Sequence, residues 1–376
     1  DIALVAHSGA GKTSLAEAML YDSGTIKRLG RVEDGNSAMD FEPEELKRMS
    51  SISSGFHQYD WKKHTINLID TPGDQNFFSD TRSCLQAADG VVVVIDAVDG
   101  IKVQTEQAWD FAAEFNQPCV IFINKLDRER ADFSLAFQAA GEIFKPKPII
   151  LQHPLGAECD FKGVVDLISG KAFEYDENGK AHKIEIPADM QEAVEAEKEN
   201  LIENIAEADD ELVERYLEGE ELTQQELAAA LRNGTLARIF VPVVCGSATR
   251  NIGIDLLMDL IVDALPSPLD RGAKPGIDPA TGKEIERAPD PEAPFSGFVV
   301  KTLADPYAGR LTIFKVVSGT LGTDGTFYNA NKETKERFNQ LLTITGKEQK
   351  PASCLLYTSP SPRDCKVDRV CRLLLE

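Results

Sequence analysis

A run of small, polar and glycine residues near the start of the chain has the spacing that binds phosphate. His7-Ser8-Gly9-Ala10-Gly11-Lys12-Thr13 fits the phosphate-loop pattern, except that Ala6 stands in place of its first glycine. In such a loop the backbone N–H groups cradle phosphates, the lysine reaches the β- and γ-phosphates, and the threonine hydroxyl ligates Mg²⁺. Residues 2–5 predict a strand before the loop, and residues 15–20 predict a helix after it. We therefore predict a nucleoside triphosphate site formed by His7, Ser8, Gly9, Ala10, Gly11, Lys12, Thr13 and Ser14; a glycine-rich turn without a ligand is the alternative.

The run Asn124-Lys125-Leu126-Asp127 favours a guanine base. It directly follows the apolar residues 119–123, which predict a strand. The Asp127 carboxylate can accept both N–H groups on the guanine edge, where adenine offers the wrong donors and acceptors. Asn124 would tie this loop to the phosphate loop, and the Lys125 stem would lie along the base. Taken alone, these residues could also be a polar turn after a strand.

Two further loops follow apolar runs that predict strands. Asp70-Thr71-Pro72-Gly73 comes after residues 65–69. Asp70 would hold Mg²⁺ through water, and the Gly73 N–H would meet the γ-phosphate, so that loss of this phosphate releases the loop. After residues 241–244 comes Gly246-Ser247-Ala248, where a backbone N–H can read guanine O6. Open α/β sheets bind nucleotides where such loops converge, at the carboxyl ends of their strands.

Composition limits the class of protein. The chain has 376 residues, a hydrophobic content of 42% and a formal net charge of −22. This length predicts two or three domains, and the charge argues against a general basic surface for nucleic acid. No apolar run approaches the ~18 residues of a membrane span. An odd number of cysteines without close-paired metal spacing favours a reducing cytosol and no zinc site.

The spacing of these motifs predicts the domain organisation. About 120 residues separate Asp127 from Gly246, far more than one helix and one strand need. We expect a doubly wound, mostly parallel α/β sheet with an inserted α/β subdomain, followed by a β-barrel. The predicted boundaries are residues 1–270 for the nucleotide-binding domain with the insertion at about 158–240, 271–292 for a linker, 293–350 for an incomplete barrel, and 351–376 for a tail.

The predicted tail does not look native. Pro360 and Pro362 are flanked by serines where a barrel should supply further strands, and proline cannot donate to a central ladder. Residues 355–364 also resemble translated adapter sequence of the kind found at the ends of assembled reads. We expect residues from about 351 onward to be non-native; a genuine disordered tail is the alternative.

The order of these motifs and the sequence between them resemble a translational GTPase of the elongation factor G family, over roughly residues 1 to 350. Residues 39–52, beginning Met39-Asp40-Phe41, resemble its first switch, with Ser51 where a Mg²⁺-binding threonine usually stands. Residues 265–268, 301–307, 318–321 and 328–330 resemble the domain exit and the barrel. The resemblance implies GTP hydrolysis to GDP and phosphate on the ribosome, with contacts to ribosomal RNA and proteins. It also implies Mg²⁺ held by Thr13, Ser51 and Asp70, a cytoplasmic monomer, and no membrane or DNA partner.

Three departures from the family pattern concern the chemistry. Gly9 replaces an aspartate, which puts a monovalent-cation site in doubt, and Ala6 replaces a glycine. Asp74 stands where the family usually has the histidine that positions the attacking water. These variants resemble the divergent, elongation-factor-G-like branch. We assign catalytic positions to Lys12 and Gly73 and, as a hypothesis, to Asp74, whose charge should slow hydrolysis unless it faces solvent; a plain solvated loop residue is the alternative.

Two alternative functions remain open. A GTP-dependent release or ribosome-protection factor shares this domain type, although the long insertion disfavours it. A GTP-switch binding module with little hydrolysis is the other, and Gly9 and Asp74 both favour it.

Overall fold

The computed structural model describes residues 1–40, 42–220, 222–278, 281–305, 309–322, 325–346, 348–352, 354–356 and 370–375. Several residues used in the sequence analysis lie outside these ranges: Phe41 of the first-switch resemblance, Pro306 and Tyr307 of the barrel resemblance, and Pro360 and Pro362 of the predicted tail.

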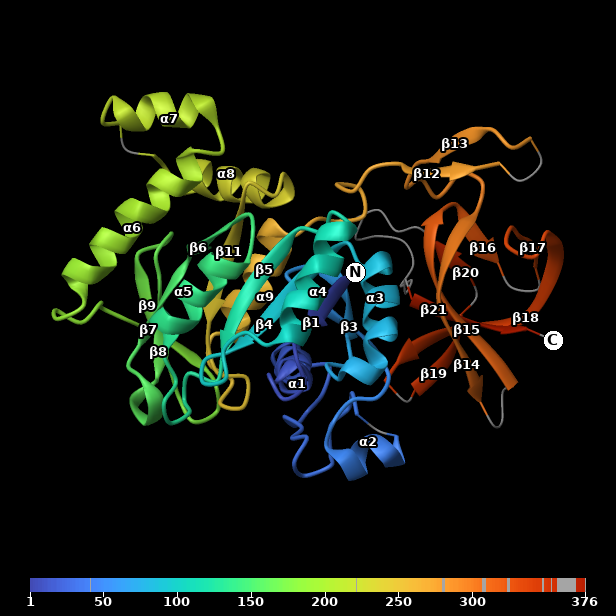
Figure 1. Ribbon diagram of the computed structural model, residues 1–376, viewed down its shortest axis with the longest axis horizontal. Coiled ribbons are helices and arrows are strands. Elements are labelled where there is room, and N and C mark those ends of the chain that lie inside the picture. Colours follow the sequence, from blue (N-terminus) through green and yellow to red (C-terminus); the bar gives the residue numbers. More distant parts are fainter. Residues whose placement is uncertain are drawn as a thin grey trace.

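A seven-stranded sheet forms the centre of the N-terminal part (Figure 1). Its order is β2-β3-β1-β4-β5-β11-β6, and all neighbours run parallel except β2 and β3. The predicted doubly wound, mostly parallel sheet is confirmed. The strands are β1 Ile2–Val5, β2 Gly55–Trp61, β3 His64–Asp70, β4 Gly90–Asp96, β5 Cys119–Asn124, β6 Lys147–Ile150 and β11 Phe240–Cys245.

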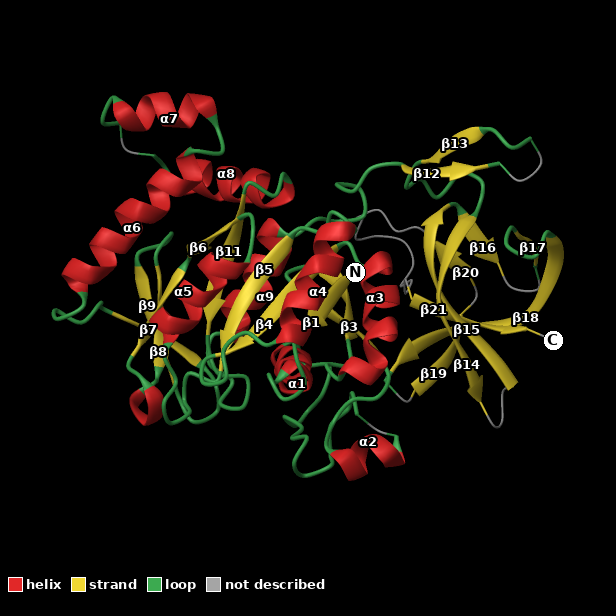
Figure 2. Cartoon of the chain, in the orientation of Figure 1, coloured by secondary structure: helices red, strands yellow, loops and turns green. Residues whose placement is uncertain are grey.

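Helices cover both faces of this sheet (Figure 2). Along β4, Val92 and Val94 belong to one buried cluster, while Val91, Val93 and Ile95 belong to the other. A strand buried on both faces reads as a continuous apolar run, which explains the sequence of β4. The helices are α1 Lys12–Asp22, α2 Pro43–Arg48, α3 Phe78–Ala87, α4 Val103–Glu114, α5 Phe133–Ile143 and α9 Ile254–Ala264, with short 3₁₀ helices η1 Gln75–Phe77 and η2 Glu158–Asp160.

The extra chain between β6 and β11 builds its own layers. A four-stranded antiparallel sheet comes first, in the order β10-β9-β8-β7. Three helices follow (Figure 1); the first of them contacts β6, and the last contacts β11 and α9. Residues 163–166 form one of the strands of this four-stranded sheet, and Gly179 has positive φ. The elements are β7 Gln152–Leu155, β8 Gly163–Asp166, β9 Lys171–Tyr175, β10 Ala181–Ile184, α6 Gln191–Ala206, α7 Asp210–Leu217 and α8 Gln224–Leu236.

The segment expected to be a linker contains a β-hairpin. Strands β12 Lys274–Ile277 and β13 Glu284–Arg287 pair antiparallel. The turn is closed by the Gly282 N–H, which donates to the Asp278 carbonyl at 2.8 Å. Periodicity did not indicate these strands, because the hairpin has no buried face to impose alternation.

Antiparallel strands make up the C-terminal part, which lies beside α3 (Figure 1). One sheet has the order β14-β15-β21-β18-β17, with β19 paired to β18, and β16 pairs with β20. Strand β21 comes from the segment that the sequence analysis expects to be non-native. The strands are β14 Ser296–Asp305, β15 Gly309–Ser318, β16 Thr320–Gly322, β17 Thr326–Asn329, β18 Thr334–Thr345, β19 Glu348–Ala352, β20 Cys354–Leu356 and β21 Val370–Leu375.

Two lysines of the strand-rich part bind the N-terminal part. The Lys315 ammonium lies 2.6 Å from the Asp89 carboxylate and donates to the Ala87 carbonyl at 2.8 Å. The Lys301 ammonium lies 2.6 Å from the Asp80 carboxylate on α3. Since both side chains of the Lys301–Asp80 pair are about 15% exposed, this pair is screened less than a surface ion pair.

We expect Lys301 and Asp80 to be energetically coupled. In a double-mutant cycle of Lys301→Met and Asp80→Asn, urea unfolding should give a coupling free energy of about 1–2 kcal/mol. The control is the exposed pair Lys62–Asp259, whose atoms lie 2.8 Å apart and whose coupling should stay below about 1 kcal/mol. Equal coupling in the two cycles would contradict the view that the Lys301 contact joins the two parts.

Candidate functional site: a nucleotide-binding centre

The phosphate loop joins β1 to α1 and depends on two glycines. Gly9 and Gly11 have φ of +88° and +96°, a region that side-chain-bearing residues rarely adopt. At Gly11 a Cβ would also lie 2.4 Å from the Asn124 Nδ2 atom. Ala6, the departure from the pattern, is buried and is not among the described residues with positive φ. A methyl group is therefore tolerated at position 6 but not at position 11.

Lys12 and Gly73 lie against each other across the loop. The buried Lys12 ammonium donates to the carbonyl oxygens of Ala6 and His7 at 3.2 and 3.0 Å. Burial lowers the pKa of Lys12 to about 8, while the Asp70 and Asp40 carboxylates oppose this shift. A Cβ at Gly73 would lie 2.4 Å from the Lys12 Nζ atom and 2.5 Å from the Ser8 backbone nitrogen. Only glycine brings its backbone this close to the phosphate loop.

Three oxygen-bearing side chains meet at the start of α1. Thr13 Oγ1 donates to Asp70 Oδ2 at 2.7 Å and lies 3.1 Å from Ser51 Oγ. The second carboxylate oxygen, Asp70 Oδ1, is buried with no hydrogen-bond partner among the described residues. Hydroxyl and carboxylate oxygens are the ligands that Mg²⁺ prefers, and an unpartnered buried oxygen calls for a cation or its water. The residues predicted for Mg²⁺ therefore come together and fit this ion.

Asp40 joins this group, although the sequence analysis gave it no role. It is 4% exposed, and one of its carboxylate oxygens has no partner within the described part of the chain. Burial and the nearby Asp40 carboxylate together raise the pKa of Asp70 to about 7, while Lys12 and the Thr13 hydroxyl oppose the shift. Asp40 belongs to the segment that resembles the first switch, and the structure places its carboxylate near Ser51. The sequence signal for it was an acidic residue within that segment.

Asn124 connects the loops predicted to bind guanine. Its Nδ2 atom donates to the Ala10 carbonyl at 3.0 Å, and its Oδ1 atom accepts from the Ala248 N–H at 3.0 Å. Lys125 donates to the Gly9 carbonyl at 2.6 Å. The Ala248 N–H, the predicted reader of guanine O6, is thus bonded to Asn124 in this structure, so reading O6 requires that this donor be shared or exchanged.

Asp127 is placed to accept hydrogen bonds. Its Oδ1 atom is buried and has no partner among the described residues. The two N–H groups on the guanine edge would need the two oxygens of this carboxylate, and Oδ1 is one acceptor that no described group uses. Gly246 and Ser247, also predicted for this site, lie in the loop after β11. The Gly246 N–H donates to the Ile123 carbonyl at 3.0 Å, which holds this loop next to the end of β5.

Asp74 caps a helix. It is the N-cap of η1, and its Oδ1 atom accepts from the Asn76 backbone N–H and from Asn76 Nδ2, each at 2.8 Å. The side chain is half-buried and directed at Asn76. Its catalytic role stays a prediction, and the capping contact gives the residue a structural role as well.

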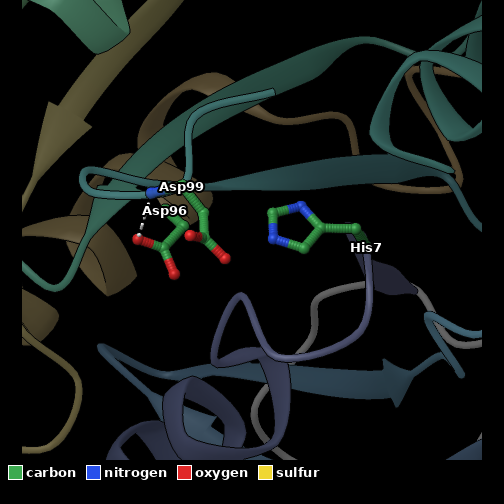
Figure 3. Close-up of side chains that lie close together, drawn as sticks. All are labelled: His7, Asp96 and Asp99. Carbon is green, nitrogen blue, oxygen red and sulfur yellow. Dashed lines mark hydrogen bonds between the residues drawn. The ribbon is translucent and has the colours of Figure 1, made fainter. Parts of the chain in front are cut away.

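His7 lies opposite two carboxylates that the sequence analysis did not identify (Figure 3). His7, Asp96 and Asp99 bring potential metal-ligating atoms within 4.8 Å of one another. Each carboxylate already has an ammonium partner, Lys125 for Asp96 at 2.7 Å and Lys102 for Asp99 at 2.5 Å. Because each carboxylate is paired with an ammonium group, an ionic network next to the phosphate loop is favoured over a metal centre. The absence of a zinc site stays a prediction. Asp96 could have been found in the sequence, because it ends a strand at the same edge of the sheet as the other loops.

Two family models match separate parts of the chain. Residues 1–267 match the family described as the elongation factor Tu GTP binding domain. Residues 294–355 match the family described as elongation factor G domain 2, so this match runs a few residues beyond the predicted start of the tail. None of the helices in the described ranges has the length and apolar character needed to cross a membrane.

A crystal structure of a protein from Thermus thermophilus has a similar fold. It is 29% identical in sequence, with a TM-score of 0.83, over 99% of this chain and 51% of that one. The chain therefore spans about half the length of the solved structure that it matches.

His7 predicts a pH dependence of stability. Burial, together with the Lys102 and Lys12 charges, lowers its pKa from 6.5 to about 4, while Asp96 and Asp99 oppose the shift. The folded protein holds His7 neutral while the unfolded chain protonates it, so this contribution to stability is complete above about pH 6.5 and is lost as the pH falls toward about 4. In urea unfolding, the wild type should lose stability over that window relative to His7→Asn.

The control for this measurement is His64→Asn, at an exposed position. That variant should keep the pH profile of the wild type. A His7→Asn profile parallel to that of the wild type would count against a neutral, buried His7.

Proposed function

Because this chain belongs to the translational GTPases of the elongation factor G type, we propose that it binds GTP with Mg²⁺ and hydrolyses it on the ribosome. The step is translocation or a related one. The protein would act as a cytoplasmic monomer, and its variant motifs resemble the divergent, elongation-factor-G-like branch. The observation that carries the proposal is the convergence of the loops after β1, β3, β5 and β11 at one edge of the sheet. At that edge, Asp127 Oδ1 and Asp70 Oδ1 are buried acceptors without partners among the described residues.

Each residue of the site has a proposed task. Lys12 supplies a desolvated ammonium to the phosphates, and the first N–H groups of α1 add to it. Thr13, Ser51 and Asp70 would hold Mg²⁺, which when bound neutralises phosphate charge. Gly73 offers its backbone N–H next to Lys12, and Asp127 reads the base. This chemistry consists of positioning and electrostatic stabilisation, without a covalent intermediate on the protein.

A GTP switch with little hydrolysis is a second candidate, and the residue type at position 74, an aspartate, favours it. Its carboxylate is held by Asn76 next to Gly73 in the sequence. A negative charge at this place opposes the approach of water to the γ-phosphate. Turnover without the ribosome should then be slow.

The base specificity of the site depends on Asp127. We expect Asp127→Asn to weaken GTP binding by about 10- to 100-fold, since the acceptor of two N–H groups is replaced. The same variant should gain affinity for xanthosine triphosphate, because xanthine carries a carbonyl where guanine carries its amino group. Titration with fluorescent nucleotides measures both.

The matched control is Glu129→Gln in the same loop, at an exposed position, which should leave both affinities unchanged. ATP should not displace GTP from the wild type. Displacement by ATP would overturn the assignment of a guanine nucleotide.

The charge at position 74 should set the rate of hydrolysis. Phosphate release from GTP is compared with and without ribosomes for the wild type, Asp74→His and Asp74→Asn. We expect ribosomes to stimulate the wild type, and Asp74→His to raise the stimulated rate by about tenfold or more, because it restores a group that can orient water. Asp74→Asn keeps an N-cap acceptor without the charge and should give a smaller rise.

The comparison also separates the two candidate functions. If neither variant responds to ribosomes, the binding-module alternative gains and a catalytic position at 74 is lost. A rise in Asp74→Asn equal to that in Asp74→His would assign the effect to charge alone.

A further inference from the structure

A cavity of about 410 Å³ lies where the N-terminal part, the β12–β13 hairpin and the strand-rich part meet. We call it the interdomain cavity; its walls are residues 86–89, 115 and 117, residues 268, 271, 272, 274–276, 287 and 289 between α9 and β14, and residues 296–298 and 315–317 of β14 and β15. This volume falls in the range of small-molecule sites, which occur preferentially between domains.

The cavity is far from the nucleotide loops. Residues 86–89 and 115–117 precede β4 and β5, so they lie at the amino ends of the strands. The nucleotide loops follow the carboxyl ends of the same strands. Since β4 has seven residues, the two places are about 20 Å apart along the sheet. The cavity is therefore a separate place on the molecule.

Its charged groups are mostly cationic. Among the described residues that line it, Arg271, Lys274, Arg287 and Lys315 are basic, and Asp89 is the carboxylate. Asp89 is bonded to Lys315 at 2.6 Å. Arg271 donates to the carbonyl oxygens of Asn116 and Phe115 at 2.7 and 3.2 Å, which carry no charge. Among the described residues, no carboxylate is therefore bonded to the Arg271 guanidinium.

Lys274 and Arg287 make no polar side-chain contacts within the described ranges. Neither side chain forms a hydrogen bond or an ion pair there. Both are half-buried. Burial lowers the pKa of Lys274, and the nearby Arg271 and Lys315 charges lower it further. The Asp89 charge opposes this shift. Because the Asp89 and Asp1 carboxylates are both paired with Lys315, the cations that an added anion would neutralise are Arg271, Lys274 and Arg287.

Two buried polar atoms at the cavity residues support the same conclusion. Across the described part of the chain, Arg271 Nε is buried and has no acceptor, and Gln117 Oε1 is buried and has no donor. Simple solvation of surface cations does not account for a buried unpartnered guanidinium N–H. The chain as a whole carries a net charge of −22, so the gathering of cations is not a consequence of average composition.

The remaining wall is apolar and partly aromatic. Phe115 and Phe298 line it together with Val316 and several prolines. Guanidinium groups bind phosphate oxygens in a bidentate fashion, and an aromatic wall accepts a flat ring. We propose that the interdomain cavity is a second ligand site that binds a small organic phosphate of mononucleotide size.

Such a ligand would join three segments that are distant in the sequence. Arg271 and Arg287 belong to the linker, Phe115 to the N-terminal part and Phe298 to the strand-rich part. A ligand that contacts all of them favours the arrangement in which they lie together. Its binding is thereby linked to the placement of the strand-rich part against the N-terminal part.

Isothermal titration calorimetry with adenosine monophosphate tests the proposal. The protein is first saturated with GDP and Mg²⁺, so that the guanine site contributes nothing. We expect saturable binding to the wild type and a loss of affinity of about tenfold or more in Lys274→Gln/Arg287→Gln, because charge-assisted hydrogen bonds are removed. Both positions are on the surface hairpin, and circular dichroism checks that the variant is folded.

The matched control is Lys283→Gln, an exposed cation on the same hairpin that does not line the cavity; it should bind like the wild type. No binding to the wild type at millimolar concentration, or equal weakening by Lys283→Gln, overturns the proposal. Inorganic phosphate is titrated in parallel. If it binds as tightly as the nucleotide, the apolar wall contributes nothing and the assignment to an organic phosphate is wrong.

Discussion

The side-chain amide of Asn124 is the contact on which the geometry of the nucleotide site depends. It donates to the Ala10 carbonyl and accepts from the Ala248 N–H, both at 3.0 Å. One side chain therefore fixes the spacing of the loops after β1, β5 and β11. Gly11 lies so close that a Cβ there would come within 2.4 Å of the amide nitrogen. The phosphate loop and the base-reading loop thus share a single packing constraint, and a change at either residue disturbs both.

A second set of contacts, centred on Asp80, links the loops of the site to the strand-rich part. Ser51, next to Thr13, is followed closely by Ser54, whose N–H and hydroxyl both donate to the Asp80 carboxylate at 2.8 Å. Asp80 lies on α3, which follows the loop containing Gly73, and it also binds Lys301 of β14 at 2.6 Å. One carboxylate thereby joins the ends of both loops expected to respond to the γ-phosphate. This is a short physical path by which their rearrangement could reach the second domain.

The sequence by itself determined the fold class and predicted which loops would form the nucleotide site. The phosphate loop, Asp70, Asn124 and Asp127 each follow an apolar run, and the physics of parallel sheets places such loops at one edge. The strands appeared within a residue or so of their predicted ranges because burial on both faces imposes continuous apolar runs on them. The insertion was visible from spacing alone, since about 120 residues between Asp127 and Gly246 exceed what one crossover needs.

Only the tertiary structure decided which polar groups meet across long separations. The places of Asp40, Asp96 and Asp99 near Asp70 and His7 follow from the packing of separate strands and loops. The β12–β13 hairpin has no buried face and so left no period in the sequence. The cations of the interdomain cavity, Lys274, Arg287 and Lys315, come from the linker hairpin and from β15. Charge composition fixes how many such groups a chain has, but the three-dimensional fold fixes which of them share a desolvated space, because electrostatic energy depends on distance and burial.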